Sequence, residues 1–542
     1  MDIKHLRDVA DELFTKKAPL NTLHQEIADQ FYPERADFTT KRSWGTDFAS
    51  NLMSSYPVQA RRSLGNQFGT MLRPTAKSWF HLKRKFMEKD DFEVTAQLQQ
   101  FQEIMRRAMY EPTSQFLRAT KEGDHDFAAF GQCAISVELN GQANGMLYRC
   151  WHLRDMAWQE DEEGKIGFKV RKAKITALTM KRTFGDKCHQ KINEACEKSP
   201  FTEFNCYHFV CDSEMYDKGT SFPRMSIWYD ADHEHLMTET PIRTQFYVIP
   251  RWQTVSGSQY SYSPATVCAL PDARLLQAMT FTLLEAGEKA TSPPILATQD
   301  AVRSDVALYA GGITWIDNEY DERLGEALRP LTQDFRGFNY GVAMNQDTRA
   351  MLHNAFFLDA LKMPERGPEM TAYEVGQRVQ EYIRNALPIF EPMEMEYNAR
   401  LCEETFDILL HNGGFGPPQA WPQALRGQEV DFAFESPLHD AIEEQKGQKF
   451  QQAQQLIGSA IALDPACAFV PKAEVALRDA LLGIGVPAAW INNADYVAKA
   501  KEAAQQQAAA QQQLAAMEQA SNAAKNLGQS GLMSPQQAMA PQ

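Results

Sequence analysis

The chain has 542 residues, which is too many for one ordinary hydrophobic core, so we expect two to four structural units. Hydrophobic residues make up 44% of it and charged residues 23%, a composition typical of globular rather than disordered proteins. The formal net charge of −15 argues against a protein whose main task is to grip nucleic acid, because such binding depends on lysine and arginine side chains that neutralise phosphates. A protein that lets DNA pass without holding it is compatible with this charge.

The sequence has no apolar run of the roughly 18–20 residues that span a bilayer, so we expect no membrane partner. Residues 1–14 predict a charged amphipathic helix without the apolar core of a signal peptide. The nine cysteines are sparse and irregularly spaced, which indicates reduced core residues and not a disulfide framework. We therefore expect a soluble, intracellular chain.

Helical periodicity dominates the chain up to about residue 122. Residues 1–35 carry apolar side chains three and four positions apart, among them Leu6 and Leu13. A second helix is expected from Ser54 to Leu72, and a third from about Asp91 to Glu122.

The pattern changes from about Phe127 to Trp252. Short runs rich in β-branched and aromatic residues are separated there by turn signals, as antiparallel hairpins require. The expected strands are Ala134–Leu139, Met146–Trp151, Ile166–Lys172, Asn205–Cys211, Met225–Tyr229 and Gln245–Pro250. This region therefore predicts a mainly β insert between helical regions.

Helices again dominate after this insert, so the expected fold class is α+β, mostly helical. A helix from about Pro271 to Ala290 starts at a proline, which is favourable because the first turn leaves its N–H groups unpaired in any case. Glycine and proline in Met363–Glu369 predict a non-helical loop. The other expected elements are strand-like runs at Pro294–Ala297 and Gly312–Ile316, and helices at Gly341–Lys362, Thr371–His411, Leu438–Leu463, Lys472–Leu482 and Asp495–Asn526.

The sequence contains no recognisable catalytic motif. It lacks the glycine-rich loop ending in Gly-Lys-Ser/Thr that cradles nucleotide phosphates, the His-Glu-x-x-His motif of zinc enzymes and the Gly-x-Ser-x-Gly turn of hydrolases. We therefore expect neither an enzyme nor a bound cofactor.

Two clusters hold residue types that could bind a metal. The first consists of Cys188, His189, Cys196, Cys206, His208 and Cys211. It lacks the paired Cys-x-x-Cys spacing that brings thiolates onto one ion, so core and surface positions are the better interpretation. The second consists of Asp230, Asp232, His233, Glu234 and His235. A hairpin turn between Trp228 and Leu236 explains it more simply, and a metal-dependent nuclease is the alternative.

Basic residues gather in Lys165–Arg182 and in Lys83–Lys85. Alternation along a strand would put several of these side chains on one sheet face. Such a face could contact DNA, although an exposed sheet face is the default interpretation.

Three segments, in this order along the chain, resemble the head-to-tail connecting (portal) protein family of short-tailed bacteriophages. The first is Ser54–Lys83, a helix rich in small residues that is followed by a proline and Trp-Phe-x-Leu. The second is Tyr262–Leu296, with an Ala-Leu-Pro-Asp helix and a Pro-Pro step. The third matches the family's Met-Thr-Ala-x-Glu helix start at Met370–Glu374 and its Pro-Ile-Phe step at Pro388–Phe390.

The resemblance implies a ring, usually of twelve copies, with a wing, a stem, a clip and a crown. It assigns 1–262 to the wing with its β insert at about 127–252, 263–290 to the first stem helix, 291–335 to the clip, 336–362 to the second stem helix, 363–370 to a tunnel loop, 371–415 to a wing return helix, 416–495 to the crown, 496–526 to a possible helical barrel and 527–542 to a disordered tail.

The resemblance also implies where partners would bind. The tunnel loop would present Met363, Pro364, Glu365, Arg366, Gly367, Pro368 and Glu369 to DNA. Its DNA-facing basic residues would be Lys362 and Arg366. The clip would meet the packaging motor and later the tail adaptor through Thr291, Pro293, Pro294, Trp315 and Asp317. An ordinary interhelical turn is the alternative for the tunnel loop.

The implied protein is a virion component at one capsid vertex, assembled in the host cytoplasm, through which double-stranded DNA is packaged and ejected. Its implied partners are further copies of itself, the terminase large subunit, a tail adaptor, and capsid and scaffolding proteins. An acidic ring would repel the duplex and so limit adhesion. Another virion structural protein, such as an internal core or tail component, is the main alternative.

Overall fold

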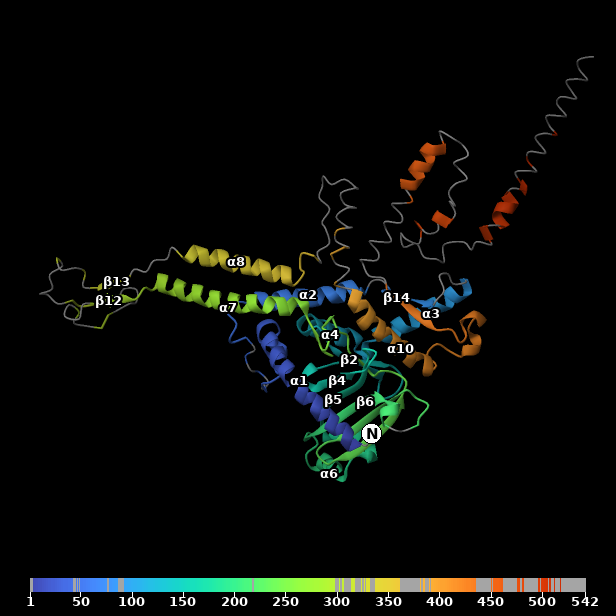
Figure 1. Ribbon diagram of the computed structural model, residues 1–542, viewed down its shortest axis with the longest axis horizontal. Coiled ribbons are helices and arrows are strands. Elements are labelled where there is room, and N and C mark those ends of the chain that lie inside the picture. Colours follow the sequence, from blue (N-terminus) through green and yellow to red (C-terminus); the bar gives the residue numbers. More distant parts are fainter. Residues whose placement is uncertain are drawn as a thin grey trace, which may run out of the picture. The chain divides into compact units, whose positions relative to one another are not determined.

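The structure is a computed structural model that describes most residues from 3 to 434. The gaps in this range are 42–44, 46, 48, 76–77, 86–91, 217–218, 298–301, 303–304, 307–312, 317–322, 324–325, 327, 332–336, 361–380, 382–383, 386–388 and 390. Beyond 434 it describes 450, 452–461, 475–477, 480–481 and some residues between 496 and 517. The chain divides into two compact units, Met1–Ala441 and Ile442–Gln542. The first unit combines helices with sheets, which confirms the α+β class (Figure 1).

Four helices open the first unit. They are α1 (Ile3–Phe31), α2 (Tyr56–Leu72), α3 (Phe92–Tyr110) and α4 (Phe116–Phe130). The prediction of one helix from about 91 to 122 is wrong, because proline disfavours the helical conformation in the residue before it. Glu111 precedes Pro112 and is extended, with φ −59° and ψ 134°, so α3 ends there. Because α4 continues to Phe130, the β region starts later than predicted.

Two antiparallel sheets form the β region. The first has the order β3 (Met146–Trp151), β2 (Ala134–Leu139), β9 (Tyr247–Val248). The second has β4 (Met156–Glu160), β5 (Ile166–Thr176), β6 (Glu203–Asp212), β7 (Arg224–Asp230) and β8 (His235–Ile242) in chain order. Each of the six predicted strands overlaps one of these, and two of them, β2 and β3, match to the residue. Strands β4 and β8 were not predicted.

Helices cover the five-stranded sheet. One of them, α1, precedes the sheet in the chain, and others are inserted between its strands. Leu6, Ala10 and Leu13 of α1 pack against a face that contains Phe168 and Val170 of β5. Between β5 and β6 the chain forms two unpredicted helices, α5 (Ala177–Phe184) and α6 (Gln190–Lys198). A larger core joins α2, α3 and α4 to the three-stranded sheet.

Two segments that lie far apart in the sequence of the first unit pair in a two-stranded sheet. Strand β1 (Phe80–Arg84) pairs antiparallel with β14 (Val430–Phe434), with Phe80 opposite Phe434. The Trp79 ring stacks on Phe434 at 6.3 Å between ring centroids. A second small pairing, β10 (Gln253–Thr254) with β11 (Ser261–Tyr262), leads into the next helix.

Helices α7 (Pro264–Thr291) and α8 (Phe338–Ala355) form an antiparallel hairpin (Figure 1). Pro264, and not Pro271, occupies the first turn, and the Ser263 hydroxyl caps the helix by accepting a hydrogen bond from the Thr266 N–H at 3.4 Å. Pro271 lies inside α7, and α8 ends at Ala355 rather than at Lys362.

Between these helices β12 (Ile295–Ala297) pairs with β13 (Leu328–Pro330). The predicted strand at Gly312–Ile316 is wrong for its described residues, where only the single bridge Val302–Ile316 forms. The remaining strand-like prediction, Pro294–Ala297, coincides with β12.

Near the end of the first unit, before β14, a π-helix, Glu394–Asn398, continues into α10 (Ala399–His411). Of the predicted helix Thr371–His411, the part before residue 381 lies outside the described residues. In the second unit the described residues of the three predicted helices after 438 are helical, and the predicted tail 527–542 is not described.

Candidate assembly surface

Helix α7 starts inside the core and then leaves it. Its buried residues all lie in its first half: Ala265, Thr266, Ala269, Leu270, Ala273, Leu276 and Gln277. From Ala278 to Thr291 the helix has no buried residue. At 1.5 Å per residue, this second half extends about 20 Å beyond the core.

Gln277 fixes the point where α7 leaves the core. Its side-chain oxygen accepts hydrogen bonds from the N–H groups of Met53 and Ser54 at 2.7 and 2.8 Å, and its amide nitrogen donates to the Ser54 carbonyl at 2.9 Å. On the returning helix, His353 Nδ1 lies 3.3 Å from the Tyr56 hydroxyl. Both ends of the hairpin are therefore anchored to the segment that begins α2.

Small and polar residues hold the two helices together outside the core. Asn345 donates a hydrogen bond to the Thr280 hydroxyl at 3.1 Å. Gly341 faces Leu283 so closely that an added Cβ atom would lie 2.9 Å from the Leu283 Cδ2 atom. Glycine at this position thus allows a close helix–helix contact.

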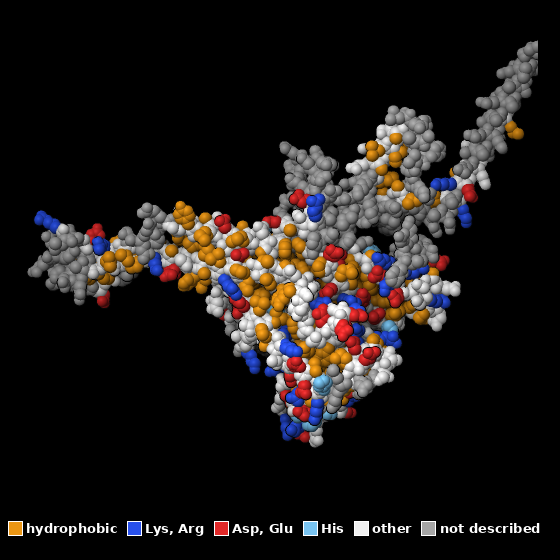
Figure 2. Space-filling model, in the orientation of Figure 1, with side chains coloured by type: hydrophobic (Ala, Val, Ile, Leu, Met, Phe, Trp, Pro, Cys, Tyr) orange, Lys and Arg blue, Asp and Glu red, His pale blue; other side chains and the backbone are white. Residues whose placement is uncertain are grey.

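The hairpin exposes large apolar side chains to an unusual degree. Phe281 and Leu284 on α7 are 53% and 55% exposed, and Tyr340 on α8 is 76% exposed. Figure 2 shows hydrophobic side chains along both helices. Contiguous exposed apolar surface marks an interaction site, because removing apolar area from water stabilises a contact by about 25 cal/mol for each Å². We call Phe281, Leu284, Tyr340 and Met344 the hairpin surface.

The segment between the helices is exposed as well. Both faces of β12 are open, and Trp315 is exposed. Of the five clip residues implied by the resemblance, Thr291 ends α7, Pro293 and Pro294 precede β12, and Trp315 lies next to the Val302–Ile316 bridge. The fifth, Asp317, lies outside the described residues.

All residues of the implied tunnel loop also lie outside the described residues. This holds for Met363, Pro364, Glu365, Arg366, Gly367, Pro368 and Glu369, and for Lys362.

The basic stretch 165–182 does not form one exposed face. Lys169 and Arg171 of β5 are buried, which contradicts both a DNA-facing and a solvent-facing position for them. The Arg171 guanidinium stacks over the Trp151 ring at 3.6 Å and donates to the Tyr247 hydroxyl at 2.9 Å. The two side chains do lie on one face of β5, as the alternation along a strand predicts. This face, however, is covered by β9 and the turn before it.

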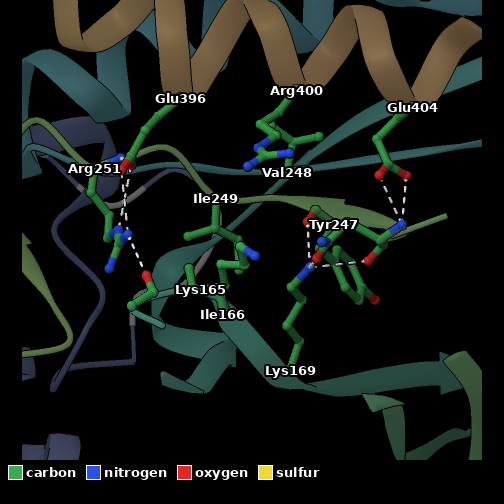
Figure 3. Close-up of a pocket in the computed structure, with 12 residues that line it drawn as sticks. Lys165, Ile166, Lys169, Tyr247, Val248, Ile249, Arg251, Glu396, Arg400 and Glu404 are labelled. Atoms are coloured by element: carbon green, nitrogen blue, oxygen red, sulfur yellow. Dashed lines mark hydrogen bonds and ion pairs between the residues drawn. The ribbon is translucent and has the colours of Figure 1, made fainter. Parts of the chain in front are cut away.

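A buried polar joint connects β5 to α10 (Figure 3). Lys169 donates hydrogen bonds to the Gln245 side-chain oxygen at 2.5 Å and to the Tyr247 carbonyl at 3.0 Å. From the opposite side, the Glu404 carboxylate accepts from the Gln245 N–H at 2.7 Å and the Phe246 N–H at 3.2 Å. Burial lowers the pKa of Lys169 and raises that of Glu404. We call Lys169, Glu404 and the turn Gln245–Tyr247 the polar joint.

The polar joint holds a strained backbone. Phe246 has φ +61°, a left-handed conformation that bulky side chains rarely adopt. A cavity of about 190 Å³ lies beside it, lined at its far end by Arg251. Arg251 is itself paired with Glu160 at 2.7 Å and Glu396 at 3.3 Å, so the π-helix and α10 are held to the β region at two places.

The cysteine and histidine residues of the first possible metal cluster, between Cys188 and Cys211, do not converge on one site. Cys188 and Cys206 belong to the small core under α5 and α6, whereas Cys211 belongs to the core under α1. His208 lies between the Tyr247 hydroxyl and the Ser226 hydroxyl, at 2.6 and 2.8 Å. Among the residues that the structure describes, no group of three or more His, Cys, Asp and Glu side chains could hold a metal ion.

The acidic cluster at 230–235 forms the predicted hairpin turn between β7 and β8. The Asp230 carboxylate is buried and accepts from His233 Nδ1 at 2.7 Å, and Asp232 accepts from the Asn205 N–H at 2.8 Å. These carboxylates thus support the turn. In the described part of the chain, no helix is long and apolar enough to cross a membrane.

Comparisons with known proteins agree on one family. The chain is 25% identical over 442 residues to a probable portal protein of Bordetella phage BPP-1, covering 79% of this chain and 78% of the relative. It is 22% identical over 291 residues to the portal protein of Salmonella phage epsilon15, covering 51% of each. The chain thus matches about half the length of the second relative.

Two solved structures share a weaker likeness. They are the neck of an empty gene transfer agent particle, at a TM-score of 0.36, and the virion of a native gene transfer agent particle, at 0.35. Each is 10% identical, with 82% of this chain and 96% of the other covered. At these TM-scores neither likeness establishes a shared fold.

The family model of the bacteriophage head to tail connecting protein matches residues 3–491. This range includes all three segments that carry the resemblance in the sequence, as well as the hairpin and the polar joint. The chain therefore belongs to the bacteriophage head to tail connecting protein family.

Proposed function

We propose that this chain is the portal subunit of a short-tailed bacteriophage, forming a ring at one capsid vertex through which double-stranded DNA is packaged and ejected. The observation that carries the proposal is the family match over residues 3–491. The probable portal protein of Bordetella phage BPP-1, alignable over 79% of this chain, supports it.

The hairpin surface supports assembly into a closed ring. In a ring, each subunit contacts two neighbours through different faces, so exposed side chains on both α7 and α8 can be covered. Phe281, Leu284 and Met344 are about half exposed, so covering each would gain about 1 kcal/mol, and the four residues together contribute to each contact. Twelve copies are the number expected from the family.

The proposed mechanism is passive. A ring of subunits with net charge −15 surrounds the duplex with a repulsive field, which limits adhesion during transport. The terminase large subunit docks on the clip, 291–335, and supplies the energy by hydrolysing ATP; the tail adaptor later takes its place. Capsid and scaffolding proteins contact the outer parts of the ring. Lys362 and Arg366 approach the DNA from the tunnel loop.

Electron microscopy of the purified full chain tests this proposal. We expect rings with a central hole for the wild type, and loss of rings for Phe281→Ser combined with Leu284→Ser. Val255→Ser is the matched control, because Val255 is equally exposed but lies outside the hairpin. A filament or a lone monomer would contradict the proposal. Rings that survive the double substitution would contradict the role of the hairpin surface in their assembly.

A nuclease assay addresses the enzymatic alternative. We expect no cleavage of double-stranded DNA when the purified chain is incubated with Mg²⁺ or Mn²⁺. Cleavage that disappears in Asp232→Asn would overturn the passive mechanism.

A further inference from the structure

The insertion between β5 and β6 is larger than the sheet requires. Thr176 and Glu203 are direct partners at the ends of the two strands, so a short turn could join them. Instead residues 177–202 form α5, a short 3-10 turn and α6. Because the sheet does not require residues 177–202, their outer surface is a candidate for a separate function.

The inner side of this insertion is a well-packed small core. Ala177, Met180 and Phe184 of α5 and Ile192 of α6 pack with Cys206 and Met237 of the sheet. This core attaches the inner faces of the two helices to the sheet.

The outer side presents two apolar side chains next to each other. Leu178 is 48% exposed and Phe201 is 78% exposed. The Leu178 N–H donates to the Pro200 carbonyl at 3.0 Å, which places the start of α5 beside the turn that carries Phe201. Among the described residues from 134 to 254, these two are the exposed large hydrophobic side chains, since the sheets cover the others.

Three cations lie close to this apolar pair along the two helices. Lys181 and Arg182 lie three and four positions after Leu178, on the same face of α5. Lys198 ends α6, just before the turn with Phe201. All three side chains are exposed, and Figure 2 shows Lys and Arg side chains at the end of the view where α6 lies in Figure 1.

Some exposed cations on other helices of the chain are paired with acidic side chains, whereas others among the described residues, such as Arg62 of α2 and Lys121 of α4, are not. Arg107 and Arg118 are paired with glutamates four positions away, at 3.0 Å each. Within the described part of the chain, Lys181, Arg182 and Lys198 form no ion pair. These three unpaired cations lie on the same insertion as the apolar pair, which also carries the exposed acidic residue Glu197 and is followed by the exposed Glu203 at the start of β6.

We propose that Leu178, Phe201, Lys181, Arg182 and Lys198 form a docking surface for an acidic protein segment that carries an apolar side chain between carboxylates. An apolar centre with a charged rim is the usual anatomy of a protein interface, in which the centre contributes affinity and the charges contribute orientation and association rate. A DNA backbone offers only phosphates, so it would use the cations and leave Phe201 in water. This surface shares no residue with the hairpin surface.

Fluorescence anisotropy with labelled peptides tests the surface on the full chain. The probe is an acidic peptide in which leucines are flanked by glutamates; one matched peptide replaces each Glu by Gln, and another replaces each Leu by Ala. We expect the first peptide to bind, and each matched peptide to bind at least about tenfold more weakly. Binding should weaken as the salt concentration rises.

Variants of the chain locate the binding. We expect Leu178→Ser with Phe201→Ser, and separately Lys181→Gln with Arg182→Gln, to lower the affinity for the acidic peptide at least about tenfold. Arg107→Gln with Arg118→Gln is the control that removes the same charge elsewhere. Circular dichroism and the presence of rings in micrographs check that each variant folds and assembles.

Three outcomes would overturn the docking surface. They are absence of binding by the acidic peptide, equal loss in the control variant, and binding of a short DNA duplex that depends on the cations but not on Phe201. Because ring formation is read separately, failure of this proposal leaves the proposed function intact, and absence of rings leaves this test interpretable.

Discussion

The polar joint and the hairpin surface differ in the burial of their side chains. In the joint, two buried charged side chains bind the same strained turn within a single chain. Lys169 donates a hydrogen bond to the Tyr247 carbonyl of this turn, and Glu404 accepts one from its Gln245 N–H. On the hairpin, Phe281 and Leu284 stay exposed, and few polar contacts such as Asn345–Thr280 bind the helices together. The difference indicates that the joint stabilises the fold of one chain, whereas the hairpin surface is left for the neighbouring subunit of the proposed ring to cover.

The largest expected effect follows from removing the acidic side of the joint. Glu404→Ala leaves the partly buried N–H groups of Gln245 and Phe246 without their acceptor, each at a cost of about 1–3 kcal/mol. We expect the free energy of unfolding of the dissociated chain to fall by about 3 kcal/mol in urea denaturation. Leu284→Ser on the hairpin should change it by less than about 0.5 kcal/mol, because this side chain is exposed in one chain. Equal losses for both variants would contradict the comparison.

The same comparison shows what sequence alone could and could not predict. Strands β2 and β3 follow from local alternation, and the helical hairpin follows from periodicity together with the family resemblance. The break at Pro112 had a local signal, the proline itself, that helical spacing on both sides obscured. In contrast, the burial of Lys169 depends on Glu404 and on a turn near residue 246, far along the chain. Lysine in an alternating strand normally faces water, so no local pattern indicates this position.

Contacts between distant segments were the hardest to predict for a related reason. Pairing of β1 with β14 joins residues near 80 and 430, and neither strand shows by itself which partner it has. Gln277 and Gly341 likewise look unremarkable in the sequence, although one anchors the hairpin and the other allows its close packing. Their roles follow from geometry that only the folded chain brings together.

A second buried lysine gives a smaller, pH-dependent effect. Lys17 of α1 donates to the carbonyls of Leu153 and Met156 at 2.5 and 2.6 Å, and burial lowers its pKa to about 7 from 10.5. Between these values the unfolded chain binds a proton that the folded chain does not, so this group makes stability rise with pH. Below about pH 7 both states are protonated and the contribution is constant.

Urea denaturation of Lys17→Met between about pH 7.5 and 9.5 measures this contribution. We expect the rise in unfolding free energy to be smaller than in the wild type by about 1.4 kcal/mol per pH unit, the value for one proton. Lys16→Met removes an exposed lysine from the same helix and should leave the slope unchanged. An unchanged slope in Lys17→Met would mean that Lys17 is not held in a dry environment.

The smallest expected effect compares a glycine on the open side of the hairpin with one between its two helices. An added Cβ atom at Gly287 on α7 meets no atom within 4 Å, whereas one at Gly341 lies 2.9 Å from Leu283. In the dissociated chain, Gly287→Ala should slow hydrogen exchange of the α7 amides, because alanine stabilises a helix interior by about 1 kcal/mol relative to glycine. Gly341→Ala should show less or none of this gain, since Leu283 must move. If Gly287→Ala also weakens ring assembly, the open side of α7 near Gly287 contacts the neighbouring subunit. If hydrogen exchange slows equally in both variants, the two helices do not pack as closely as Gly341 indicates.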